Sequence, residues 1–158
     1  MKRNIITLLI TVFAMLQATA QTYDNLWKQA DIIAQKDQPK SEIGVMKKII
    51  SKATVAKDYG QLLAAEIRQA ILWREISPDS LTPNVKRMEA EALNAKDPVL
   101  KAVRYAVLGK VYREVNGKKS EEFFKKALEQ PELLARNAST GYVPLTLKGV
   151  DGSSFKND

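Results

Sequence analysis

The chain has 158 residues, with 25 lysines and arginines, 18 acidic residues, no histidine and no cysteine, for a formal net charge of +7. Without histidine or cysteine, Ser-His-Asp triads, cysteine nucleophiles and the usual zinc, haem and iron–sulfur ligands are excluded. No disulfide can form, so the fold must be held together by packing.

The first segment, residues 1–20, has the layout of a secretory signal peptide. Lys2 and Arg3 form a basic start, residues 5–16 are uncharged and mostly apolar, and Ala18-Thr19-Ala20 matches a small-x-small cleavage site. The apolar stretch is short for a membrane span, which needs about 20 residues. We therefore expect Sec-type export to the periplasm or the cell exterior, cleavage after Ala20, and no stable membrane insertion afterwards. Cleavage removes two cations, and the resulting charge of +5 on an exported chain argues against a nucleic-acid partner.

The rest of the chain carries apolar residues at helical spacing, which predicts six helices joined by short loops and a final helical turn. The expected segments are Tyr23–Ala34, Pro39–Ala53, Asp58–Trp73, Pro83–Leu93, Pro98–Val115, Ser120–Leu128 and Pro131–Leu134. Apolar residues nearly encircle the third segment, so we expect that helix to be central. Asp97 before Pro98 is typical of a helix cap followed by a first-turn proline.

Breaks between the helices are marked by proline, glycine and short polar residues. Ser77–Pro83 is predicted to be a loop, with Thr82 capping the fourth helix. Asn116-Gly117 is predicted to end the fifth helix, since both residues tolerate a left-handed backbone. We expect a helical repeat-like domain over 21–137 and an irregular tail over 138–158, with at most one short strand at Tyr142–Leu147.

The fifth and sixth expected helices carry a spaced motif. Its first half matches W-x2-L-G-x2-Y with tyrosine in the tryptophan position, at Tyr105, Leu108, Gly109 and Tyr112. Its second half matches A-x3-F-x2-A with a following proline, at Ser120, Phe124, Ala127 and Pro131. This spacing resembles a tetratricopeptide repeat, in which paired helices cross closely at small residues. The resemblance implies an all-α fold of antiparallel helix pairs stacked in a right-handed array; an ordinary helical bundle is the alternative.

The carboxylates suggest no active site. Glu89 and Glu91 are two residues apart and should face different sides of their helix, and Glu121 and Glu122 lie in a first turn, where acids favour the helix dipole. No catalytic residue, metal ligand or cofactor is therefore predicted. Five aromatic residues could line a peptide groove or belong to the core, and their helical spacing favours the core. They are Tyr23, Trp27, Trp73, Tyr105 and Tyr112.

Two surface features are candidate sites. Lys47, Lys48 and Lys52 give the second helix a basic outer face, which could bind an anionic partner or simply be solvated. Ser80, in Asp79-Ser80-Leu81, resembles a short O-glycosylation motif that some bacteria use on exported proteins.

Several short segments resemble, in order and spacing, the N-terminal helical region of large bacterial alpha-2-macroglobulin-like proteins. They are Tyr23–Lys28, Lys36–Ser41, Phe124–Leu128 with Pro131–Leu134, Tyr142–Leu145 and Lys148-Gly149. Members of that family are long exported proteins that trap or block proteases, are built mainly from β-sandwich domains, and often carry a Cys–Gln thioester. The 158 residues hold no cysteine and no predicted run of strands, so the resemblance implies the leading helical module alone, as a fragment.

The leading hypothesis is a non-enzymatic, exported helical module that binds a protein partner, as part of a macroglobulin-like protease-defence protein. A free-standing periplasmic tetratricopeptide-like scaffold is the first alternative. A small-ligand carrier or a carboxylate enzyme is the second.

Overall fold

The computed structural model describes residues 22–113, 115–137 and 139–147; the predicted signal peptide and residues 148–158 lie outside these ranges. Every regular element within them is helical, which confirms the predicted all-α class. The elements are α2 (Tyr23–Ala34), α3 (Pro39–Ala56), α4 (Tyr59–Ile76), α5 (Pro78–Asn94), α6 (Pro98–Tyr112), α7 (Gly117–Ala127), α8 (Pro131–Ala135), the 3-10 turn η1 (Ser139–Tyr142) and α9 (Pro144–Leu147).

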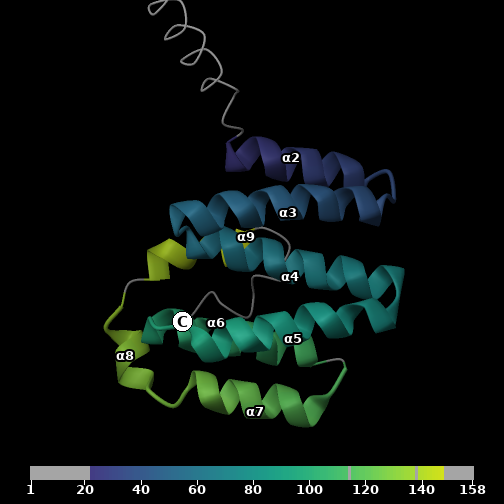
Figure 1. Ribbon diagram of the computed structural model, residues 1–158. Coiled ribbons are helices and arrows are strands. Elements are labelled where there is room, and N and C mark those ends of the chain that lie inside the picture. Colours follow the sequence, from purple (N-terminus) through teal and green to yellow (C-terminus); the bar gives the residue numbers. More distant parts are fainter. Residues whose placement is uncertain (1–21, 114, 138, 148–158) are drawn as a thin grey trace, which may run out of the picture.

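The helices form an open stack. Each helix from α2 to α7 packs on the next one along the chain, and α4 also contacts α6. Figure 1 shows α2 at one end of the stack and α7 at the other, so the first and last long helices do not close into a bundle. This order agrees with stacked helix pairs, while the right-handed, tetratricopeptide-like form of the array stays a prediction.

Side chains cap several helix starts where the sequence places short polar residues. The Asp97 carboxylate accepts from the amides of Val99 and Leu100 at 2.8 and 3.0 Å, and Pro98 occupies the first turn of α6. Asp58 caps α4 by accepting from the Gln61 amide at 3.2 Å. The predicted combination of cap and proline at Asp97-Pro98 is confirmed.

The predicted loop Ser77–Pro83 is wrong. The structure begins α5 at Pro78, after Ser77 in an extended conformation, and Pro83 lies inside the helix. Two prolines stand five residues apart, and either could occupy a first turn, where the missing amide is not needed. The sequence interpretation chose the second proline, whereas the fold uses the first.

The predicted role of Asn116-Gly117 is also wrong. Helix α6 ends at Tyr112, and Asn116 caps the start of α7 by accepting from the Lys119 amide at 3.1 Å. Asparagine suits both a left-handed helix end and an N-cap, and here the cap is used. Left-handed backbone occurs instead at Lys57, where α3 ends with a φ of 55°.

The expected strand at Tyr142–Leu147 is wrong as well. Residues 139–147 form η1 and α9, and both elements pack on α4. Leu145 is only 2% exposed and belongs to the main core. Pro144 suits the first turn of a helix. The described residues contain no strand with which this segment could form a hydrogen-bond ladder. This part of the predicted irregular tail is therefore regular and packed.

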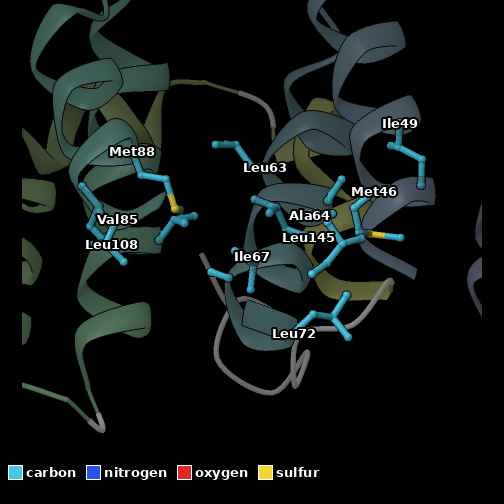
Figure 2. Packing of buried hydrophobic residues seen from close by; sticks show 14 of the residues in the cluster. Met46, Ile49, Leu63, Ala64, Ile67, Leu72, Val85, Met88, Leu108 and Leu145 are labelled. Carbon is cyan, nitrogen blue, oxygen red and sulfur yellow. The ribbon is translucent and has the colours of Figure 1, made fainter. Parts of the chain in front are cut away.

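Helix α4 lies at the centre of the molecule, as its apolar pattern predicts. It contacts α3, α5, α6, η1 and α9. Figure 2 shows Leu63 and Ile67 of α4 between Met88 and Leu108 on one side and Met46 on the other. The buried apolar residues of α4 are Leu62, Leu63, Ala64, Ala65, Ile67, Ala70 and Leu72.

Helices α6 and α7 cross closely at the spaced motif. A Cβ atom on Gly109 would lie 2.8–2.9 Å from ring atoms of Phe124, and the Ser120 hydroxyl donates to the Gly109 carbonyl at 2.7 Å. Phe123 stacks on Tyr112, with ring centroids 5.6 Å apart. The motif's small residues thus have the close-packing role that its spacing implies.

We expect Gly109→Ala to destabilise the fold by about 1–3 kcal/mol, because the added methyl group overpacks the α6–α7 crossing. The matched control is Gly44→Ala in α3, where a Cβ meets nothing within 4 Å. There the better helix propensity of alanine should add about 0.5–1 kcal/mol. Urea unfolding followed by circular dichroism measures both changes, and equal stabilisation by the two substitutions would contradict the close crossing.

Candidate partner-binding face and buried ion pairs

The three predicted lysines meet on the outer side of α3. The inner side of this helix is fully buried through Met46, Ile49 and Ala53, each 0% exposed, whereas the intervening Lys47, Lys48 and Ser51 are exposed. The outward side of α3 is an open, nearly flat patch of six residues. They are Lys47, Lys48, Ser51, Lys52, Val55 and Ala56. The structure therefore places the candidate residues together on one open helix face.

This α3 face combines positive charge with exposed apolar surface. Val55 is 86% exposed, the largest fraction among the exposed large apolar residues of the described chain. The Lys52 ammonium lies 4.9 Å from the centroid of the Tyr23 ring, in a cation–π contact that links α3 to α2. Within the described residues no acidic side chain forms an ion pair with Lys47 or Lys48. The face can therefore offer two cations and an apolar side chain to an incoming group.

Ser80, the candidate glycosylation residue, lies within α5 and not in the predicted loop. Ser80 is helical because α5 begins at Pro78. Modification of Ser80 stays a prediction.

The aromatic residues that could have lined a groove belong to the core or pack against it. Trp27 is 2% exposed, and its Nε1–H donates to Oε1 of Gln61 at 2.7 Å. The other four are partly buried and packed on the core: Tyr23, Trp73, Tyr105 and Tyr112. The core interpretation is confirmed.

A buried ion-pair network joins α4, α5 and α6. Glu66 is 1% exposed and accepts from Nη1 of Arg87 at 3.0 Å and from Nη1 of Arg104 at 3.1 Å. Glu91 also accepts from both arginines, with 2.9 Å to Nη1 of Arg104. Burial raises the pKa of Glu66 to about 7; the charge of Arg104 opposes the shift and that of Glu91 adds to it.

Sequence reasoning missed this network, although one signal was present. Glu66 interrupts the apolar run of α4 between Ala65 and Ile67, and Arg104 stands between Val103 and Tyr105 in α6. A charged residue on the buried side of a helix almost always has a charged partner. Spacing along the chain could not identify that partner, because the four side chains come from three helices.

A second polar cluster ties α5 to α6 and α7. Oε1 of Glu89 accepts from the Tyr112 hydroxyl at 2.6 Å and from the Lys119 ammonium at 3.0 Å. Although burial opposes the shift, these hydrogen bonds lower the pKa of Glu89. Glu89 thus reaches Tyr112 of α6 and Lys119 of α7. Glu91 instead reaches Arg104 of α6 and interacts with Glu66 of α4, so the two carboxylates have different partners.

We expect the free energy of unfolding to decrease as pH rises from about 4.5 to about 7. In this window folded Glu66 keeps a proton that the unfolded chain has released, so ionisation favours unfolding. The loss is roughly 3 kcal/mol at about 1.4 kcal/mol for each pKa unit. Glu66→Gln cannot ionise and should remove most of this slope, whereas the exposed Glu132→Gln should keep it. Urea unfolding at pH 5, 6 and 8 measures the slopes, and an unchanged slope in Glu66→Gln would rule out Glu66 as the titrating group.

Neither a metal centre nor a membrane span is found in the described ranges. Within residues 22–113, 115–137 and 139–147, acidic side chains do not gather in threes to hold a metal ion. No helix in this part of the chain has the length and apolar character needed to cross a bilayer.

Comparison of the chain with protein-family models, with curated proteins and with solved structures finds no match.

Proposed function

We propose that the chain is a non-enzymatic, exported helical module that binds a protein partner through the α3 face. The observation that carries this proposal is the open face on which Lys47, Lys48 and Lys52 lie on the same side of α3 as the exposed Val55. Within the described residues Lys47 and Lys48 form no ion pair with an acidic side chain, so they can attract an acidic partner without first breaking an internal one. Val55, 86% exposed on the same side of α3, adds apolar contact area to the basic face.

The partner that fits this face is an acidic amphipathic segment. Its carboxylates would pair with Lys47 and Lys48, and its apolar side would cover Val55 and Ala56. Because the opposite side of α3 is packed into the core, the face is preorganised and loses little conformational freedom on binding.

Fluorescence anisotropy with a labelled, synthetic 18-residue helical peptide, bearing glutamates on one side and leucines beside them, tests the proposal. Lys47→Glu/Lys48→Glu should weaken binding at least tenfold, and Val55→Ser should weaken it without any change of charge. The matched control is Lys96→Glu/Lys118→Glu, which changes net charge equally at exposed positions elsewhere. Equal losses of binding affinity in the two double variants would mean that net charge alone explains the weaker binding. Failure of the wild type to bind the peptide would refute the proposal.

We further propose that the module belongs to an alpha-2-macroglobulin-like protease-defence protein. Support comes from the order of the short segments described above and from the all-helical fold. The nucleotide sequence after the Asp158 codon tests this directly, since an adjoining frame encoding β-sandwich domains is expected. Unrelated flanking genes in every isolate would overturn this assignment and favour the free-standing scaffold.

A further inference from the structure

A cleft of about 270 Å³ lies between α6, α7 and α8, and it shares no residue with the α3 face. One side of α6 forms its first wall, because Pro98, Lys101, Ala102 and Tyr105 follow one another at helical spacing. The end of α7 and the link after it form the second wall, and Leu133 of α8 lies on the third side (Figure 1). Walls from three elements can surround a ligand, which a single helix face cannot do.

Much of the cleft surface is apolar. Pro98, Ala102 and Leu133 contribute aliphatic groups from two of the walls. Tyr105 adds an aromatic ring, which stacks on Phe123 with the ring centroids 6.0 Å apart and is thereby held in place. Sites for drug-sized molecules have volumes of about 300–1,000 Å³, so this cleft suits a smaller molecule with an apolar body.

Among the described residues that line the cleft, Lys101 supplies the cation available to a ligand, since its ammonium forms no ion pair with any of them. The Lys126 ammonium is already engaged, at 2.6 Å from Oε1 of Glu122. Glu129 also lines the cleft, and its negative charge acts on Lys126. A ligand with one negative charge is therefore matched by Lys101, whereas a second negative charge would be repelled by Glu129.

We propose that this cleft binds a small monocarboxylate with an apolar body. Lys101 and Tyr105 stand one helical turn apart, so the ammonium and the phenolic hydroxyl can both bind the carboxylate of the ligand. This hydroxyl has no hydrogen-bond partner within the part of the chain that the structure describes. The apolar body lies against Ala102 and Leu133. The inference does not depend on the function proposed for the α3 face.

A heteronuclear NMR titration of the full chain with 4-phenylbutyrate at pH 8 tests the proposal. We expect a saturable shift of the backbone amides of Lys101, Tyr105 and Leu133, and no shift at Lys47. The neutral 4-phenylbutanamide should bind at least tenfold more weakly, because it cannot pair with the ammonium. The dianionic 3-phenylpropylphosphonate should bind no more tightly than the carboxylate. Absence of a saturable shift, or tighter binding of the dianion, would overturn the proposal.

A matched pair of lysine substitutions separates the site from net charge. Lys101→Met keeps a long side chain but removes the cation, and it should weaken binding of 4-phenylbutyrate at least tenfold. Lys118→Met removes an exposed cation at the opposite end of α7 from Lys126 and should leave the affinity unchanged. Equal weakening by both substitutions would mean that the acid is attracted by overall charge alone, and the assigned site would be wrong.

A second pair of substitutions tests the volume of the cleft without any change of charge. Ala102→Leu should fill the cleft and weaken binding at least tenfold, whereas Ala90→Leu, at an exposed position of α5, should have no effect. Far-UV circular dichroism shows whether both variants keep the helical fold. Wild-type affinity in a folded Ala102→Leu variant would show that the acid binds elsewhere.

Discussion

Arg104→Met is expected to lower the free energy of unfolding at pH 8 by about 3–5 kcal/mol, the typical cost of removing one partner from a buried ion pair. Glu66, at 1% exposure, then keeps only Arg87 as a cationic partner, and Glu91 also loses a donor. Urea unfolding measures the loss. The control Arg113→Met removes an exposed arginine from the end of α6 and should change stability by less than about 0.5 kcal/mol.

A second substitution separates the charge effect from the loss of packing. Adding Glu66→Gln to Arg104→Met removes the poorly compensated carboxylate and should recover a large part of the lost stability. The double-mutant cycle gives the coupling between the two side chains, expected at about 1–3 kcal/mol. Additive losses would mean that Arg104 acts through its apolar stem and not through Glu66.

Leu63→Ala is expected to destabilise the fold by about 2–5 kcal/mol, because it leaves a cavity in the central helix. Leu63 is 0% exposed and lies between the two sides of the core in Figure 2, so neighbours on both sides lose contacts. Thermal and urea unfolding measure the change. Leu93→Ala is the matched control, since Leu93 is 65% exposed in α5 and should lose less than about 1 kcal/mol. Similar losses at the two positions would contradict the central place of α4.

Local patterns predicted much of this fold. The apolar spacing of α2 gave its limits at Tyr23 and Ala34, and the nearly encircled α4 is the central helix. Short polar caps with a following proline worked at Asp97, where only one proline was available. They failed at Thr82-Pro83, because α5 begins at Pro78, the earlier of the two prolines, and Pro83 lies inside the helix.

Features that join distant segments could not be predicted. The partners of Glu66 come from α5 and α6, and nothing in the α4 sequence identifies them. The need for glycine at position 60 arises only when Gly141 and Pro144 fold back onto it. The α3 face was predictable because a single amphipathic helix carries it, and the helical period alone places Lys47, Lys48 and Lys52 together. Its binding role depends on a partner, which periodicity cannot identify.

The contact of α9 with α4 has a mechanical consequence. In a linear stack of helices, the terminal helix frays first and the loss spreads inward one helix at a time. Here the chain from α5 to α8 forms a loop whose two ends are both fastened to α4. When the chain is pulled at Leu147, the packing contact between α9 and α4 therefore bears the force first. Helix α7 comes under load only after that contact has separated.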